Sequence, residues 1–308
     1  MEFKHTSVLL DESIEGLNIR AEGIYLDCTL GGAGHAAAIA SRLTTGTLIA
    51  FDQDEAALAA ARIRLKDVGC NVELIKTNFE NLNEALDSAG ITALDGVLYD
   101  LGVSSYQLDT PERGFSYMND GPLDMRMDDG ADLTAEVIVN TYPEREICKI
   151  IREYGEDNWA ARIAQFIVNA RKTNHIVTTG QLTAIIKAAI PAAARRDGPH
   201  PAKRTFQALR IAVNRELEIL EHSFSAAVER LKPGGRICII TFHSLEDRIA
   251  KQFFVRLAKG CVCPPRMPIC VCGKKPSLKI IGNIIPGTNE LEVNPRARSA
   301  RLRMAEKI

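Results

Sequence analysis

The sequence has little of what marks membrane-inserted, secreted or highly basic proteins. It contains no run of about 18 consecutive apolar residues, so a membrane-spanning helix is not expected. The first residues, 1–12, include no apolar stretch of the kind found in signal peptides, which favours a cytoplasmic protein. The formal net charge is −1, from 38 basic and 39 acidic side chains, which argues against binding nucleic acid by overall charge alone.

Cysteine is scarce outside one short segment. Four of the eight cysteines, Cys28, Cys70, Cys148 and Cys238, are scattered singly, unlike the disulfide framework of a secreted domain. The other four, Cys261, Cys263, Cys270 and Cys272, fall within twelve residues beside Pro and Gly. Four thiolates at this spacing predict a structural zinc site that the chemistry does not need, with free thiols or an oxidised pair as the alternatives.

What the sequence does contain is an alternation of short apolar runs with longer helical patterns. With 308 residues, 46% of them hydrophobic, the chain is long enough for about two domains. We expect strands at 24–29, 47–52, 72–76 and 94–100, separated by helices at 35–43, 55–66 and 81–89. This order predicts an α/β fold of βαβ units with a parallel sheet.

The alternation is interrupted after residue 102 and resumes near residue 203. Residues 133–190 show amphipathic helical patterns throughout. A long helix near 203–231, a strand at 236–242, a helix near 245–258 and extended stretches at 278–281 and 300–304 follow. We therefore predict a first part of the α/β domain over 1–108, an inserted, mainly helical substrate-recognition domain over 109–202, and a second part over 203–308.

A glycine-rich turn, residues 27–35 (DCTLGGAGH), joins the first expected strand to its helix. Glycines there allow positive φ and let a ligand approach the backbone. Asp52 ends the second strand, where a carboxylate can accept hydrogen bonds from both hydroxyls of a ribose. The pattern Gly32-x-Gly34-x-x-Ala37 suits NAD, S-adenosylmethionine or a purely structural turn.

Asp27 favours S-adenosylmethionine among these three. A carboxylate just before the turn suits a ligand that carries an ammonium and a sulfonium, whereas it would repel a pyrophosphate. The segment 232–240 (KPGGRICII) and the extended stretches near the C-terminus also fit a methyltransferase sheet better than a dehydrogenase. An NAD-dependent α/β enzyme remains the alternative.

Seven short motifs occur in order along the chain, and together they carry a family resemblance. They are DLGVSS (100–105), QLD (107–109), ERGFS (112–116), GPLDMRMD (121–128), RTFQA (204–208), FHSLEDR (242–248) and NPRARS (294–299). In combination they resemble the RsmH (MraW) family of bacterial 16S ribosomal RNA cytosine-N4 methyltransferases. The resemblance runs from Lys4 to the last ten residues.

The resemblance implies a class I, Rossmann-like methyltransferase sheet with an inserted helical domain. It implies methylation of the exocyclic N4 of a cytidine in the decoding-centre region of 16S rRNA, with S-adenosyl-L-methionine as cofactor. The partner would be 16S rRNA within the small ribosomal subunit, with no membrane, and the protein would be a monomer or homodimer. A non-catalytic RNA-binding assembly factor is a further alternative. By the motif match, the cofactor pocket comprises Ala33, Gly34, His35, Asp52, Phe79, Asp100 and Gln107.

Asp100 is the main candidate for the catalytic group. Ligands of open α/β sheets bind beyond the carboxyl ends of the strands, and Asp100 ends the fourth. The cytosine N4 lone pair is delocalised into the ring. Attack on a methyl group therefore needs a hydrogen-bond acceptor that draws the amino group toward tetrahedral geometry and so localises the lone pair on N4. Because Leu-Gly-Val follows, in place of the Pro-Pro-aromatic usual for exocyclic amines, Ser104 or a backbone carbonyl is an alternative acceptor. His243 could contact the substrate, or be a loop histidine bonded to backbone.

C5 methylation, the competing chemistry, requires a cysteine nucleophile at a strand end. Cys238 lies inside the fifth expected strand, so we expect it in the core.

For RNA contact the sequence offers two basic segments, 195–215 with six Arg or Lys against one Asp, and 294–308 with five against one Glu.

Overall fold

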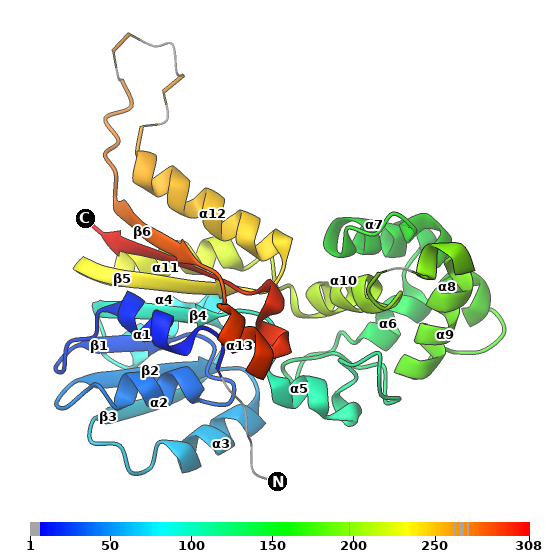
Figure 1. The fold of residues 1–308 in the computed structure, drawn as a ribbon, viewed down its shortest axis with the longest axis horizontal. Helices are drawn as coiled ribbons and strands as arrows, with labels where there is room; N and C mark the ends of the chain where they lie inside the picture. The colour runs from blue at the N-terminus through cyan, green and yellow to red at the C-terminus, as the bar shows by residue number, and fades with distance from the viewer. Residues whose placement is uncertain (1–6, 197, 262, 265–267, 270) are drawn as a thin grey trace. The chain divides into compact units, whose positions relative to one another are not determined.

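The computed structural model describes residues 7–196, 198–261, 263–264, 268–269 and 271–308. The chain divides into two compact units, one formed by Met1–Gly102 with Leu217–Ile308 and the other by Val103–Glu216 (Figure 1). Among the described residues, no helix combines the length and the apolar character that crossing a membrane demands.

The first unit is a seven-stranded sheet covered by helices. Its elements before residue 103 are α1 (Leu10–Leu17), β1 (Ile24–Asp27), α2 (Gly34–Ala40), β2 (Thr47–Asp52), α3 (Glu55–Arg64), β3 (Asn71–Lys76), η1 (Phe79–Asn81), α4 (Leu82–Ser88) and β4 (Leu94–Asp100). After residue 216 follow α11 (Leu220–Arg230), β5 (Leu231–Thr241), α12 (Ser244–Lys259), β6 (Leu278–Ile284), α13 (Thr288–Val293), η4 (Pro295–Ser299) and β7 (Arg301–Lys307). The predicted α/β class is confirmed.

The strand order is β3-β2-β1-β4-β5-β7-β6, and the sheet reverses its winding between β1 and β4. Strands β1 to β5 are parallel, whereas β7 runs antiparallel to both β5 and β6. In the register, Asp27 lies opposite Ala50 of β2 and Leu98 of β4. The carboxyl ends of β1, β2 and β4, which carry Asp27, Asp52 and Asp100, therefore meet at one edge beside the switch point.

Alternate side chains of the buried strands enter two separate cores. In β2, Leu48 and Ala50 join the core that α1, α2 and α3 cover, whereas Ile49 and Phe51 join the core under α4, α11 and α12. A parallel strand covered on both faces reads as a continuous apolar run, which is why these strands are visible in the sequence. Helix α1 was not predicted.

The second unit is helical. It contains α5 (Ser105–Asp109), η2 (Pro111–Arg113), α6 (Ala135–Thr141), α7 (Glu144–Gly155), α8 (Ala160–Arg171), α9 (Thr179–Ala189), η3 (Ala192–Arg195) and α10 (Lys203–Asn214). Its core draws on α6 to α10 and on the loop residues Phe115, Leu123, Met125 and Met127. The motif at 121–128 is a structural loop, because Asn214 donates to the Met125 carbonyl and accepts from the Met127 amide, both at 2.8 Å.

The predicted long helix near 203–231 is wrong, because the structure breaks it into α10 and α11. Arg215 follows α10 with φ of 52°, in the left-handed region, which ends the helix. The unit boundaries, between residues 102 and 103 and between 216 and 217, also differ from the predicted 108/109 and 202/203. The physical reason is that Phe206, Leu209 and Val213 of α10 pack into the core of the helical unit.

Candidate functional site

The turn after β1 presents backbone to open space on one side and packs tightly on the other. Gly31 and Ala33 have φ of 48° and 57°, which turns the chain sharply before α2. A Cβ added to Gly34 would collide with Ser7 Oγ, whereas one added to Gly32 would meet nothing within 4 Å. The turn at Gly32 therefore leaves room for a ligand, and Gly34 is required by packing.

Asp52 ends β2 and holds this turn in place. Its Oδ2 accepts a hydrogen bond from the Gly31 amide at 2.8 Å, and its Oδ1 accepts one from the Asp54 amide at 2.9 Å. A carboxylate has about four lone-pair positions, and the Gln53 amide also bonds to this one, so the backbone bonds leave capacity for a ligand hydroxyl. The predicted ribose-binding residue thus also shapes the turn.

Asp27 and Asp100 are joined through Thr29. Asp27 Oδ1 accepts from the Thr29 amide at 3.0 Å, and Thr29 Oγ1 accepts from the Asp100 amide at 2.6 Å. The second oxygens, Asp27 Oδ2 and Asp100 Oδ1, are buried and have no hydrogen-bond partner in the protein. A buried carboxylate oxygen without a partner is costly, so both atoms indicate a bound donor or cation.

His35 lies between these carboxylates at the start of α2. Its Nδ1 is 3.4 Å from Asp100 Oδ2, and its Nε2 is 3.1 Å from the carbonyl oxygen of Val8. Burial opposes a charge on the ring, but the hydrogen bond to Asp100 and the fields of Asp100 and Asp27 outweigh it and raise the pKa of His35. A protonated ring can donate from both nitrogens and thereby fixes Asp100 Oδ2.

Burial also raises the pKa of two carboxyl groups of the site. Desolvation, opposed mainly by the field of His35 for Asp27 and by backbone amides for Asp52, raises both pKa values to about 6. Clustered carboxyl groups with raised pKa values are typical of functional sites. A cationic ligand would relieve the cost of ionising them.

Phe79, at the start of η1, borders the core under α4 and α11. Its ring is half-buried and packs edge-on against Tyr99, with the ring centroids 5.6 Å apart. Its carbonyl accepts a hydrogen bond from Ser223 Oγ at 2.9 Å. This position is compatible with the predicted adenine contact and with a core role.

Ser104 and Gln107 belong to the second unit and form the N-terminal cap of α5. Ser104 Oγ accepts from the Gln107 amide at 3.2 Å, while Gln107 Oε1 accepts from the Ser104 amide at 3.1 Å. This reciprocal pair is a capping box. Both predicted site residues therefore have a structural role within their own unit.

His243 is the N-cap of α12. Its Nδ1 accepts from the Glu246 amide at 3.5 Å, and its Nε2 lies 3.1 Å from Glu246 Oε1. Glu246 Oε2 in turn accepts from the Phe242 amide at 2.8 Å. Asp247 forms a bidentate ion pair with Arg303, at 2.7 and 2.9 Å. The cap accounts for His243 Nδ1, but Nε2 is buried and has no hydrogen-bond partner in the protein, so its contact with a bound group stays a prediction.

The predicted metal ligands are brought together in part. Ligand atoms of Cys261, Cys263 and Cys272 lie within 4.8 Å of one another, and Cys270 lies outside the described residues. Cys238 is fully buried in β5, as predicted.

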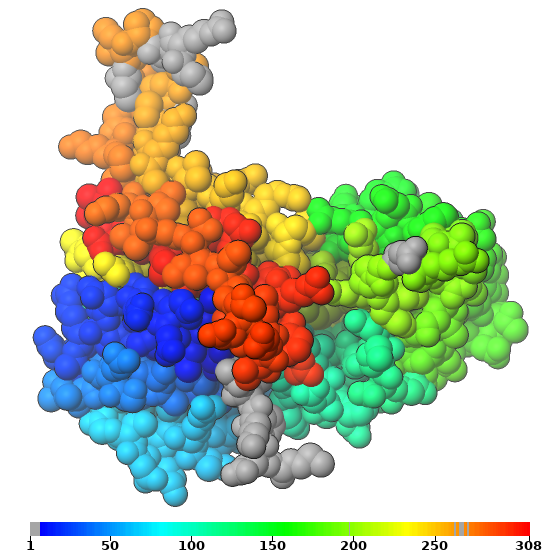
Figure 2. All heavy atoms as spheres, in the orientation of Figure 1, coloured from blue at the N-terminus to red at the C-terminus, as the bar shows by residue number. Residues whose placement is uncertain are grey.

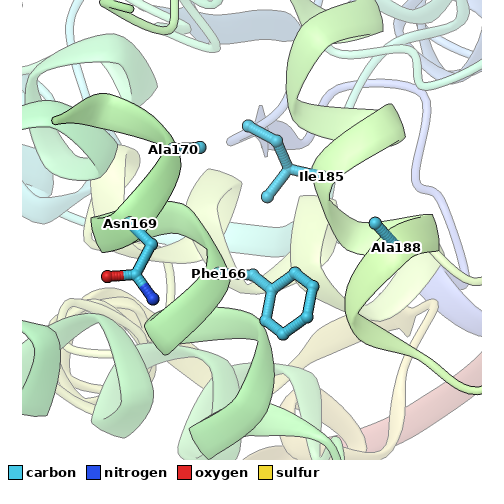
Figure 3. Close-up of a pocket in the computed structure, with 5 residues that line it drawn as sticks. All are labelled: Phe166, Asn169, Ala170, Ile185 and Ala188. Carbon is cyan, nitrogen blue, oxygen red and sulfur yellow. The ribbon is translucent and has the colours of Figure 1, made fainter. Parts of the chain in front are cut away.

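The helical unit contains a pocket between α8 and α9. It has a volume of about 340 Å³. Phe166, Asn169 and Ala170 of α8 line it opposite Ile185 and Ala188 of α9 (Figure 3). The guanidinium of Arg162 lies 5.4 Å from the centroid of the Phe166 ring. An aromatic ring beside an amide and a guanidinium is a surface on which a nucleobase can stack.

Two residues that contact the predicted site side chains were not identified from the sequence. Thr29 was read as part of the strand, and the carbonyl of Val8 comes from a loop before α1. Both contacts depend on tertiary packing, and only Thr29, two residues after Asp27, could have been noticed in the sequence.

Comparisons with known proteins agree on one family. A family model described as the MraW methylase family matches residues 2–308. Proteins named "Ribosomal RNA small subunit methyltransferase H" from Clostridioides difficile and Brevibacillus brevis are each 56% identical to the chain, covering 100% of it and 100% and 99% of their own lengths. A solved rRNA methylase from Streptococcus thermophilus shares 14% identity over 100% of this chain and 99% of its own, with a TM-score of 0.45, a likeness too low to bear on function.

Proposed function

Because the chain belongs to the MraW methylase family, we propose that it methylates the exocyclic N4 of a cytidine in the decoding-centre region of 16S rRNA, using S-adenosyl-L-methionine. The observation that carries the proposal is the pair of buried, unpartnered oxygens, Asp27 Oδ2 and Asp100 Oδ1, beside an open glycine turn. The protein would act in the cytoplasm, as a monomer or homodimer, on rRNA of the small ribosomal subunit.

The residues at the strand ends fit the cofactor. Asp27 would pair with its positive groups, Asp52 would accept from the ribose hydroxyls, and Phe79 would cover the adenine. The turn around Gly32 would let its atoms approach the backbone. When bound, the cofactor supplies an electrophilic methyl group.

Asp100 would prepare the amine for attack. His35 fixes Asp100 Oδ2, which leaves Oδ1 as the acceptor for an N–H of the cytosine amine. Accepting that hydrogen bond draws the nitrogen toward tetrahedral geometry and makes its lone pair available, and the carboxylate can receive the proton that N4 loses. Fixing the acceptor beforehand reduces the entropic cost of alignment.

Charge and shape on the helical unit support RNA as the partner. Residues 158–196, which include α8 and α9, contain six Arg or Lys and no Asp or Glu. Such a segment can neutralise phosphates even though the whole chain has a net charge of −1. The pocket at Phe166 could hold one unstacked base of an RNA in which the target base is extruded.

The competing chemistries fit less well. C5 methylation requires an accessible cysteine, but Cys238 is fully buried within β5, with its Sγ 4.0 Å from the carbonyl of Ser13. NAD would bring a pyrophosphate toward the buried carboxyl group of Asp27. An assembly factor without catalysis would not need the unpartnered oxygen of Asp100.

The test is methylation of small ribosomal subunits that lack the modification, followed by nucleoside mass spectrometry that resolves N4- from C5-methylcytidine. The wild type should form N4-methylcytidine, and Asp100→Asn should lower kcat by about 100-fold or more, since it loses the charged acceptor while keeping the shape. Asp67→Asn, at an exposed site of the same unit, is the matched control and should be unaffected. A C5 product, or an Asp100→Asn variant with full activity, would overturn the proposal.

A further inference from the structure

The segment between α12 and β6, residues 260–277, is an arm whose described residues contribute to none of the hydrophobic cores. None of its described residues from Cys261 to Ser277 is buried, and Ile269 and Val271 are 74% and 71% exposed. Figures 1 and 2 show the arm extending from the end of α12, clear of the sheet of its own unit. Apolar burial therefore does not hold its described residues in place, whereas a metal ion bound by side chains of both limbs would do so.

The two limbs of the arm, one leaving α12 and one returning to β6, lie against each other where they join the unit, at the root of the arm. The Ser277 amide donates to the Leu257 carbonyl at 3.0 Å. At Gly260, φ is 66°, and an added Cβ would collide with the backbone at Lys275 and Pro276, so only glycine fits. The chain thus leaves and re-enters the unit at one point, which brings Cys261 close to the returning limb.

Three cysteine sulfurs converge just beyond this root. The Sγ atoms of Cys261, Cys263 and Cys272 lie within 4.8 Å of one another, with Cys261 and Cys272 at 3.8 Å. Tetrahedral zinc with Zn–S bonds of about 2.3 Å requires sulfurs about 3.8 Å apart. A disulfide requires about 2.05 Å and would use only two of the three thiols. The separation of Cys261 and Cys272 therefore matches two ligands of one metal ion, and Cys263 lies close enough to join them.

The segment around the thiols is rich in basic residues. Residues 248–289 contain eight Arg or Lys and no Asp or Glu, among them Lys259, Lys274 and Lys275 near the thiols. Positive charge lowers the cost of ionising a thiol and of placing several thiolates together. Because the segment offers sulfur and no carboxylate, it selects a thiophilic ion over Mg²⁺ or Ca²⁺.

We propose that Cys261, Cys263 and Cys272 bind one zinc ion as thiolates and that this ion fixes the arm. Each thiol loses its proton to solvent and donates a lone pair to the metal, with no change in oxidation state, and a fourth ligand completes the tetrahedron. Cys270 lies outside the described residues, and the proposal does not depend on it. The site lies apart from the carboxylates at the ends of β1 and β4, so the proposal stands independently of the methyltransferase function.

The test is the metal content of full-length protein purified in a thiol reductant without chelator or added zinc. Wild type should contain about one zinc per chain, and the double variant C261S/C272S should lose at least about nine-tenths of it. Cys70→Ser, at a half-buried cysteine in the loop before β3, is the matched control and should keep its metal. Replacement of zinc by Co²⁺ in the wild type should give the absorption bands of tetrahedral cobalt thiolate.

A second measurement keeps the test independent of folding of the variant. Removing the metal from wild type with a chelator should speed tryptic cleavage after Lys274 by about tenfold or more, because metal loss frees the arm. Wild type that neither contains zinc nor binds Co²⁺ would overturn the proposal. So would equal metal content in C261S/C272S, or a disulfide among these cysteines in the reduced protein.

Discussion

Among the carboxyl groups of the site, Asp27 and Asp52 are those whose pKa values burial raises. Their pKa values of about 6 exceed the ordinary 3.8, so between these values the folded chain binds more protons than the unfolded chain. Their contribution to stability is therefore complete below about pH 4 and is lost as the pH rises through about 6. The difference of about 2 pKa units corresponds to roughly 3 kcal/mol for each group, as an order of magnitude.

We expect Asp27→Asn to stabilise the protein without cofactor at about pH 7.5, by roughly 1 to 3 kcal/mol, because it removes a buried charge. The gain should shrink toward about pH 5, where Asp27 of the wild type is protonated. Thermal unfolding at both pH values measures this difference. The same variant should bind the cofactor at least about tenfold more weakly, because it lacks the negative charge that faces the cation. If the variant were less stable than the wild type at both pH values, the electrostatic explanation would be contradicted.

Cofactor affinity of the wild type should rise between about pH 5 and pH 7 and then level off. Raising the pH through about 6 ionises Asp27 and Asp52, beside His35 and Asp100, and so makes the site more negative toward a cationic ligand. Calorimetric titration with S-adenosylmethionine over this range tests the trend. Affinity that falls with rising pH would show that the carboxylates do not face the cation.

The sequence allowed the residues at the strand ends to be predicted but not their partners. Asp27, Asp52 and Asp100 could be identified because each ends a recognisable apolar run in a known topology. The links through Thr29 and Val8 join segments 71 and 27 residues apart, and no local pattern encodes such contacts. Ser104 and Gln107 show the opposite case, where a motif predicted for ligand contact serves to cap a helix.

At the level of elements, the capping of α12 allows two interpretations of His243 to be tested. The residue either caps the helix only or also contacts the substrate. If His243 only caps the helix, His243→Ala should lower stability by about 1 kcal/mol, and His243→Asn should restore most of it, because asparagine is a good N-cap. Both variants should keep kcat within about threefold at a temperature where they are folded. A loss of kcat by 100-fold or more in the Asn variant, with normal stability, would instead indicate contact with the substrate.

The elements predicted best are those whose pattern depends on local burial alone. Strands β1 to β4 and the helices between them match the predicted ranges within a few residues, since buried parallel strands give apolar runs bounded by glycine turns. The break at Arg215 could not be predicted, because α10 and α11 have continuous helical patterns and only the packing of α10 into another core separates them. Non-glycine residues enter the left-handed region where tertiary contacts compensate the strain.

For the whole molecule, the two units have complete and separate cores. Both cores of the sheet unit are formed entirely by residues outside 103–216. We therefore expect a variant in which a short glycine linker replaces residues 103–216 to fold and to bind S-adenosylmethionine, with affinity within about tenfold of the wild type. It should not methylate rRNA, because it lacks the basic surface of α8 and α9.

Calorimetry and the ribosomal subunit assay together check this expectation. The full chain with the substitution Phe166→Ala provides an intermediate case, since it keeps both units and removes only the stacking surface of the pocket. Methylation by the linker variant at the rate of the full chain would refute an RNA-recognition role for the helical unit.

The position of the helical unit between β4 and β5 also affects how the protein emerges from the ribosome. Strand β4 ends at Asp100 and β5 begins at Leu231, so its sheet neighbour is translated about 130 residues later. At about 5 to 20 residues per second, β4 waits roughly ten seconds with one edge unpaired. Meanwhile the helical unit, which is contiguous in the chain, is complete and can fold first. A protein with this order of synthesis carries a temporarily exposed sheet edge of the kind that chaperones bind, which makes its yield sensitive to the speed of translation through residues 103–216.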